Sequence, residues 1–386
     1  MPTLERIEAF ADDLTAIRRD FHEHPELGFE EVRTSSKVAE MMESWGIEVT
    51  RGIGKTGVVG VLKGNRPGRR IGLRADMDAL PIHEQTNLPY ASKTPGVMHA
   101  CGHDSHTTML LGAARYLAEA RDFAGTAVFI FQPAEEGLGG ARAMIADGLF
   151  DRFPCDELYG LHNSPFHDHG EFGVKKGAAM AGASFFDITI TGQGSHAARP
   201  EGSKDPVVIG AGLVGEIQSI VSRNLAPTHP VVVSVTQFHA GTAYNVIPET
   251  AVLTGTVRYF DPEDMALVEQ RLRALCAGFA VAHDCEITAE IRNVFDVLMN
   301  DDQRAEDLLA VATDVVGAEH ARLKDDVVMG SEDMADMLRV VPGAYCTLGH
   351  GGNVALHNPG YVFDDAALPV GASFFARMVE MRGAAA

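Results

Sequence analysis

Residues 126–137 read TAVFIFQPAEEG, and this stretch decides the fold. Its first half, 126–131, is an unbroken apolar run of the length expected for a central strand that is covered on both faces of a sheet. Its second half places Glu135 and Glu136 directly after that strand. Because adjacent carboxylates beside a buried strand are costly unless they bind something, the stretch predicts a ligand site there. The alternative is a solvated pair that opens the next helix.

The segments on either side alternate between helical and strand patterns through the first 180 residues. Apolar spacing predicts helices over 4–21, 35–45, 104–123 and 140–147, and strands over 57–62, 71–73 and 157–161. Such alternation is typical of an α/β layer fold, in which ligands gather where strand ends meet loops.

The pattern changes at about residue 183. Strands are expected over 185–191, 231–238, 251–259 and 286–292, with helices over 205–222 and 262–282. The order β-α-β-β-α-β is that of a ferredoxin-like module. The later elements, helices over 303–316, 332–338 and 365–381 and a strand over 344–348, are too few for a separate α/β domain. We therefore expect one discontinuous domain, 1–182 with 296–386, interrupted by an inserted domain over 183–295.

Composition excludes several classes of partner. The 386 residues carry 32 Lys and Arg against 53 Asp and Glu, a formal net charge of −21, which disfavours nucleic acid and anionic membrane surfaces. No stretch approaches the roughly 20 apolar residues of a membrane span, and the first residues lack an apolar signal core. Five scattered cysteines suit a reducing compartment, so a cytoplasmic location is expected.

Histidines in loops suggest a metal site. HACGHD, residues 99–104, brings Cys101 and His103 into one loop that leads into a helix, and thiolate with imidazole suits a borderline-soft cation such as zinc. Alone, this pair could equally be a buried cysteine beside a capping histidine. His162 follows the strand over 157–161, and His357 lies in a second Leu-His-Asn tripeptide. Ligand-type residues after several strands together favour metal binding. If the chain at 135–136 is extended, one glutamate can bind metal while the other serves as a base.

Ordered motifs run along nearly the whole chain: FHEHPELGFEE, GLRADMDALPI, MHACGHDSHTTMLLGAA, FQPAEEGLGGA, LHN, GQGSHAARP, AYNVIPE and LHNPGY. They resemble the metal-dependent aminoacylase and carboxypeptidase hydrolases. Within that family they look like the hippurate hydrolase or N-acyl-L-amino-acid amidohydrolase branch, which includes indole-acetyl-amino-acid hydrolases. The resemblance implies a zinc-peptidase-like α/β/α catalytic domain and an inserted lid.

The resemblance also implies a site with two divalent metal ions. Cys101 would bridge both ions, with His103 and His162 completing one site and Glu136 and His357 the other, while Glu135 matches the family's general base. In most relatives outside the branch the bridging ligand is an aspartate, and a His-x-Asp motif precedes it. Here that motif reads Asp76-Met77-Asp78, so Asp76 stands where a metal-binding histidine would be, and His103 replaces it. Asp78 matches the acidic residue that orients a ligand, although it could be a strand-end cap.

The inserted module resembles the family's lid and dimerisation domain. His196 matches a residue that in relatives reaches into the partner subunit's site and holds the carbonyl oxygen. Asn245 and Arg258 match positions that bind the substrate carboxylate, a task that suits the guanidinium fork. The alternative for Arg258 is a surface strand residue paired with Asp261 or Glu263.

The expected function is hydrolysis of the amide bond of N-acyl-L-amino acids by metal-activated water, with hippurate-like or N-acetyl substrates. N-acetyl-diaminopimelate deacetylase and indole-acetyl-amino-acid hydrolase activities remain alternatives. Zinc is favoured, with manganese, cobalt or nickel also accepted by such ligands. Two other classes rank lower: a hydrolase with Cys101 as nucleophile and His103 as base, and a non-catalytic amino-acid-binding protein.

Overall fold

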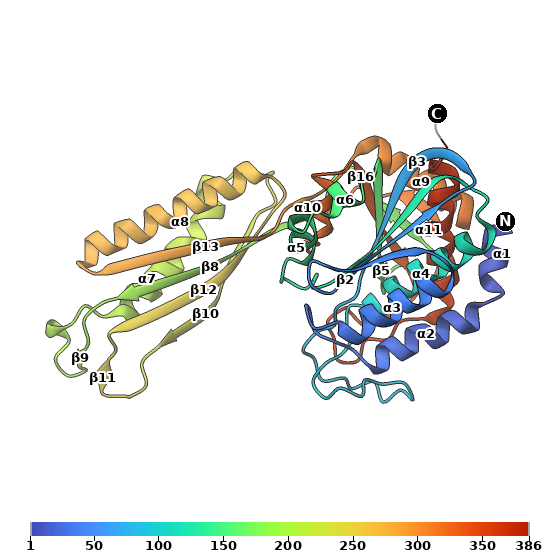
Figure 1. Cartoon of the computed structure of the whole chain (residues 1–386). Helices are drawn as coiled ribbons and strands as arrows, with labels where there is room; N and C mark the ends of the chain where they lie inside the picture. The colour runs from blue at the N-terminus through green and yellow to red at the C-terminus, as the bar shows by residue number, and fades with distance from the viewer. Residues whose placement is uncertain (1, 385–386) are drawn as a thin grey trace. The chain divides into compact units, whose positions relative to one another are not determined.

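A computed structural model describes residues 2–384 and divides them between two compact units (Figure 1). The first unit contains the chain up to Ala179, then Leu298–Val327, and the chain from Asp333 onward. The second contains Met180–Val297 and Val328–Glu332. The predicted α/β class with a second, inserted module is confirmed. Among the described residues, no helix has the length and apolar character needed to cross a membrane.

The first unit is built on an eight-stranded sheet with the order β1-β2-β4-β3-β5-β16-β6-β15. Its four adjacent strands β4, β3, β5 and β16 run parallel. The side chains of β4, β5 and β16 are almost all buried, as is β3 from Ile71 onward, which is expected for central strands. The bounds are β1 Glu48–Ile53, β2 Gly57–Lys63, β3 Arg66–Asp76, β4 Ala124–Gln132, β5 Glu157–Ser164, β6 Phe172–Val174, β15 Ala321–Leu323 and β16 Gly343–Gly349. A short pair, β7 (Gly177–Met180) and β14 (Leu298–Asn300), forms a separate ladder.

Helices enclose this sheet. Helices α4 and α11 pack against each other and against β3, while α5 contacts β4 and α10. The bounds are α1 Pro2–Glu8, α2 Ala11–Glu23, α3 Val32–Ser44, α4 His103–Ala120, α5 Gly140–Ala146, α6 Leu149–Arg152, α9 Asp302–Val316, α10 Met334–Leu338 and α11 Leu368–Arg382. The single helix predicted over 4–21 is wrong, because the chain turns between α1 and α2. Ile7, Phe10 and Leu14 are all buried across that turn, so the apolar period continues while the helix does not.

The second unit is the predicted ferredoxin-like module. Its strands β8 (Gly182–Thr191), β10 (Val232–Ala240), β12 (Thr250–Tyr259) and β13 (Glu286–Phe295) form an antiparallel sheet in the order β10-β12-β8-β13. Helices α7 (Pro206–Ser219) and α8 (Pro262–His283) pack on each other and on this sheet. Each helix begins with an Asp-Pro pair: the carboxylates of Asp205 and Asp261 accept backbone N–H groups of the first turn.

A buried ion cluster ties α2 to the start of α4. The carboxylate of Asp104 lies 2.8 Å from Nδ1 of His22 and 3.3 Å from the Arg18 guanidinium. Burial lowers the pKa of His22, but the Asp104 carboxylate more than compensates and raises it to about 9. His22 is therefore charged at neutral pH in the folded protein, and the cluster fixes the first turn of α4.

We predict that, because of this cluster, the free energy of unfolding falls as pH rises above neutrality. Since the folded pKa of His22 exceeds the value of 6.5 for a free histidine, its contribution is complete below about pH 6.5 and is lost as pH rises toward about 9. The loss is on the order of 3 kcal/mol in the free energy of unfolding. Urea unfolding across this range should show a decline for the wild type and a flatter profile for His22→Gln. Equal slopes for the two proteins would contradict the prediction.

Candidate metal centre

The parallel strands bring four ligand-type segments to one edge of the sheet. β3 ends at Asp76, and β4 ends at Gln132, three residues before Glu135. His162 lies near the end of β5, and His357 lies in the loop after β16. Because β4, β3, β5 and β16 are neighbours and parallel, their carboxyl ends meet at this edge.

Two triads of potential ligand atoms share Cys101. One contains Cys101, His103 and His162, and the other contains Cys101, Glu136 and His357; within each triad the ligand atoms all lie within 4.8 Å of one another. Sγ of Cys101 is 3.3 Å from Nε2 of His162. Nε2 of His357 is 3.2 Å from Oε1 of Glu136. A sulfur atom common to two triads is the arrangement that a bridging thiolate requires.

Hydrogen bonds to backbone oxygens orient the imidazoles of His103 and His162 through Nδ1, so that Nε2 of each ring can bind a metal ion. Nδ1 of His103 donates to the backbone oxygen of Asp78 at 2.9 Å, and Nδ1 of His162 donates to the backbone oxygen of Asn163 at 2.7 Å. The lone pair of each ring is then on Nε2, and Nε2 of His103 is buried without a hydrogen-bond partner. An orphaned imidazole nitrogen beside thiolate and carboxylate ligands fits a divalent cation.

Asp78 touches two ligand-bearing residues. Its Oδ1 lies 3.2 Å from Nδ1 of His103, and its Oδ2 accepts the backbone N–H of Glu136 at 3.0 Å. One buried carboxylate therefore contacts a potential ligand residue of each triad.

The two glutamates lie in a turn, so the condition of an extended chain, on which the opposite directions of their side chains depended, is not met. Ala134 has a left-handed φ of 54°, and Gly137 donates back to the oxygen of Glu135. The buried carboxylate of Glu31 accepts the Ala134 N–H at 2.8 Å and holds the turn. The turn brings a carboxylate oxygen of the buried Glu135 within 4.8 Å of ligand atoms of His103 and Glu136.

Burial sets the charge state of two ligand groups. It lowers the pKa of His162 to about 3, with a smaller contribution from His106, so this ring is neutral, as a metal ligand must be. Burial, followed by the Glu136 carboxylate, raises the pKa of the Cys101 thiol. Without a cation this thiol therefore resists ionisation.

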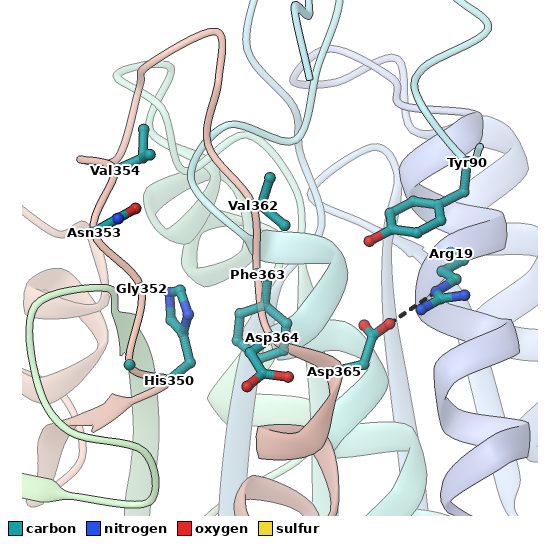
Figure 2. A pocket seen from close by; sticks show the side chains of 11 residues that line it. Arg19, Tyr90, His350, Gly352, Asn353, Val354, Val362, Phe363, Asp364 and Asp365 are labelled. Carbon is teal, nitrogen blue, oxygen red and sulfur yellow. Dashed lines mark hydrogen bonds and ion pairs between the residues drawn. The ribbon is translucent and has the colours of Figure 1, made fainter. Parts of the chain in front are cut away.

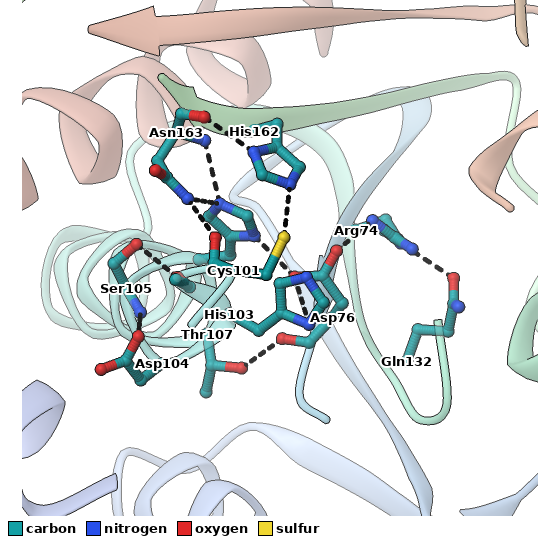
Figure 3. Close-up of polar contacts among 12 residues, drawn as sticks. Arg74, Asp76, Cys101, His103, Asp104, Ser105, Thr107, Gln132, His162 and Asn163 are labelled. Carbon is teal, nitrogen blue, oxygen red and sulfur yellow. Dashed lines mark hydrogen bonds and ion pairs between the residues drawn. The ribbon is translucent and has the colours of Figure 1, made fainter. Parts of the chain in front are cut away.

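Sequence reasoning missed His106 as a site residue. Nδ1 of His106 donates to Asp76 Oδ1 at 2.6 Å, and its Nε2 accepts the backbone N–H of Asn163 at 2.9 Å. Asp76 in turn binds the buried Arg74 guanidinium at 2.6 Å (Figure 3). His106 follows His103 by three residues on α4, and this helical spacing was the available signal. Asp76 thus supports a neighbouring histidine.

The remaining candidate residues belong to the second unit. His196 is exposed on β9 (Ser195–His196), which pairs with β11 (Val246–Ile247), and the backbone oxygen of Asn245 accepts the N–H of Ala197 at 3.0 Å. His196 and Asn245 are thus close neighbours. Arg258, on β12, donates to Thr256 and lies 6.0 Å from the Phe185 ring. Across residues 2–384 Arg258 hydrogen-bonds only to Thr256 and Val257 and forms no ion pair with a carboxylate, so the surface pairing considered above is absent.

A parallel sheet edge that brings a cysteine thiol, imidazoles and carboxylates together beside a further carboxylate is typical of a metal-dependent hydrolase. Comparison with known proteins agrees. Residues 72–381 match the model of peptidase family M20/M25/M40. Hippurate hydrolase of Campylobacter jejuni is 46% identical over 362 residues, 94% of each chain. N-acetylcysteine deacetylase of Bacillus subtilis is 38% identical over 377 residues, 96% of this chain and 97% of that protein.

A solved structure supports the same family assignment. The YXEP protein of Bacillus subtilis, described as a dinuclear metal-binding peptidase of family M20, superposes with a TM-score of 0.83 at 35% identity, covering 97% of this chain and 99% of that one. The chain therefore belongs to peptidase family M20/M25/M40 and is a hydrolase. The family resemblance drawn from the motifs is confirmed.

We predict that Arg74 stabilises the fold beneath the site. Its guanidinium is fully buried against the carboxylates of Asp76 and Asp333, at 2.6 Å and 3.1 Å. Arg74→Met would leave both charges buried without this cation and should lower the free energy of unfolding by about 3–5 kcal/mol in urea titration. The matched control is Arg66→Met, because Arg66 pairs with Asp122 at the exposed surface and should cost at most about 1 kcal/mol. Equal losses in the two variants would contradict the prediction.

Proposed function

We propose that this chain is a two-metal amidohydrolase that cleaves N-acyl-L-amino acids into a carboxylic acid and a free amino acid. The observation that carries the proposal is the pair of ligand triads that share Cys101 beside the buried Glu135. Relatives named hippurate hydrolase and N-acetylcysteine deacetylase support hydrolysis of an amide in a small molecule.

In this proposal two cations would be held by five residues: Cys101 would be shared, with His103 and His162 for one cation and Glu136 and His357 for the other. The mixed sulfur, nitrogen and oxygen donors favour zinc, and they also accept manganese, cobalt or nickel. Bound divalent cations would lower the pKa of a water molecule from about 15.7 toward 7 and polarise the amide carbonyl.

The residues of the chain supply the proton transfers. Glu135 accepts the proton of the attacking water and returns it to the departing amine, so one carboxylate acts first as base and then as acid. Asp78 acts as a positioning residue, because it holds His103 and the Glu136 backbone.

The second unit supplies substrate recognition in this proposal. Arg258 and Asn245 bind the substrate carboxylate, and His196 of a second copy donates to the carbonyl oxygen. We assign residues 183–295 as a lid and dimerisation domain on this basis, with a homodimer as the active form. The absence of a carboxylate paired with Arg258 among the described residues supports its role, since the guanidinium fork can then meet an anion.

The location proposed is the cytoplasm. All five cysteines are unpaired, which suits a reducing compartment. The net charge of −21 supports a small-molecule substrate over nucleic acid or a membrane surface.

The alternatives fare differently. N-acetyl-diaminopimelate or indole-acetyl-amino-acid hydrolysis uses the same bond chemistry and differs only in the acyl and amino-acid groups. A Cys101 nucleophile is disfavoured, because burial raises the pKa of this thiol whereas nucleophilic cysteines need it lowered. A non-catalytic binding protein would have no use for Glu135 beside two ligand triads.

We predict that Glu135→Gln abolishes turnover while metal content stays unchanged. Hydrolysis of hippurate, N-acetyl amino acids, N-acetyl-diaminopimelate and indole-acetyl conjugates is measured with zinc, manganese, cobalt or nickel. The variant should lose about 100-fold or more in kcat on the preferred substrate, since the proton acceptor is gone. Glu136→Gln is the contrasting variant and should lose metal. Near-normal kcat in Glu135→Gln would remove Glu135 from the role of base, and no hydrolysis by the wild type would overturn the proposed function.

We also predict that Cys101→Ala binds neither cation tightly, because both triads lose their shared ligand. Metal content after dialysis should fall below that of His162→Ala, which removes a ligand from one triad only. Cys285→Ala in the second unit is the control and should bind metal like the wild type. Full metal occupancy in Cys101→Ala would exclude the bridging role.

A further inference from the structure

Three of the ligand-bearing segments meet at Asn163. Its side-chain Nδ2 donates to the backbone oxygen of Cys101 at 2.6 Å, and its Oδ1 accepts the hydroxyl of Tyr361 at 2.7 Å. Its neighbour on β5 is His162. Asn163 is 2% exposed, so these bonds form in an environment where an unpaired amide would be costly.

Asn163 also contacts His106, the histidine that pairs with Asp76. Nε2 of His106 lies 2.9 Å from the backbone nitrogen of Asn163 and 3.0 Å from its Nδ2. Both nitrogens of Asn163 are donors, so Nε2 of His106 is the acceptor and its proton is on Nδ1, toward Asp76. The Asn163 amide is therefore fully specified in orientation.

The third segment is the loop that carries His357. Tyr361 follows His357 by four residues, and the backbone N–H of His357 donates to Ala100 at 2.8 Å. Successive carbonyls at Ala100 and Cys101 thus bind the His357 loop and Asn163. Tyr361 also lies 3.4 Å from Nε2 of the buried His350, which lines a pocket of about 430 Å³ between the two ends of that loop (Figure 2).

Gly102 gives independent evidence that the Asn163 and Tyr361 side chains lie close to the backbone next to Cys101. Its φ is +88°, and a Cβ atom there would lie 2.4 Å from Nδ2 of Asn163 and 2.8 Å from the Tyr361 hydroxyl. The chain therefore has no side chain at the point where the amide and the phenol come together.

We propose that Asn163 is the positioning residue that holds the bridging Cys101 at its distance from His162 and links it to the His357 loop. The inference rests on the proposed two-metal function. Without the side-chain amide, the Cys101 carbonyl loses its donor and the thiol is no longer fixed 3.3 Å from His162. Asn163 itself contributes no ligand atom, so its effect passes through the geometry of the residues it holds.

The test uses cobalt(II) as the probe, because a cobalt–thiolate bond gives a charge-transfer absorption band that reports the bridging cysteine directly. Wild-type protein, Asn163→Ala and Asn163→Ser are stripped of metal and titrated with cobalt(II) against a chelator. We expect about 10–100-fold weaker cobalt binding in both variants and a weakened or shifted thiolate band.

Thr108→Val is the matched control. Its hydroxyl donates to the backbone oxygen of Asp104 at 2.7 Å and, like the Asn163 side chain, is buried, so the substitution also deletes one buried hydrogen bond. This control should retain the wild-type affinity and band. Circular dichroism of the metal-free proteins shows whether each variant is folded. If Asn163→Ala is unfolded, the cobalt(II) titration of Asn163→Ser is used in its place.

The outcomes separate the two proposals. If the wild type binds cobalt(II) with a thiolate band and a folded Asn163 variant matches it in affinity and spectrum, the positioning role is wrong while the metal site stands. If Thr108→Val loses as much affinity as the Asn163 variants, the effect is general destabilisation and the positioning role is also wrong. If the wild type binds no cobalt(II), both the metal function and this inference are overturned.

Discussion

The parallel alignment of β4, β3, β5 and β16 is the constraint on which the site depends. Parallel neighbours end at the same edge of the sheet, so residues separated by more than 200 positions reach one point. Parallel strands need crossover connections, and helices occupy them here: α4 lies between β3 and β4, and α5 and α6 lie between β4 and β5. β4 and β16 are buried along nearly their whole length, and residues on or directly after such strands are held more accurately than residues on long loops.

Buried charge is the second theme of this molecule. The site gathers Asp76, Asp78 and Glu135 in a protein whose net charge is already −21. Two fully buried arginines offset part of this charge: Arg74 beneath the sheet edge and Arg18 beside the first turn of α4. Protein cations therefore balance the supporting carboxylates, while in the proposed enzyme bound metal would balance the Glu136 carboxylate and the ionised form of Cys101.

The two units divide the work of the proposed enzyme. The first presents a buried, hydrogen-bonded cluster in which imidazole orientation is set by backbone carbonyls and Asp78. The second carries Arg258, Asn245 and His196 on an antiparallel sheet and a short two-stranded ladder. A cluster that must stay dry suits the interior of an α/β domain, and groups that must meet an incoming anion suit a more exposed module.

Much of this could be predicted from the sequence alone. The apolar run over 126–131, the β-α-β-β-α-β order and the ordered motifs determined the fold class and the family, because these signals depend on period and order along the chain. The turn between α1 and α2 could not be predicted, since the apolar spacing continues through it.

The side-chain contacts within the site follow from the tertiary structure and could not be predicted from the sequence. Asp76 pairs with His106, the glutamates lie in a turn held by Glu31, and Asn163 joins Cys101 to Tyr361 across nearly 200 residues. Such contacts depend on the order of strands in the sheet and on the close approach that Gly102 permits. Local sequence encodes periodicity and turn chemistry, whereas these distances arise from packing between segments that are far apart in the chain.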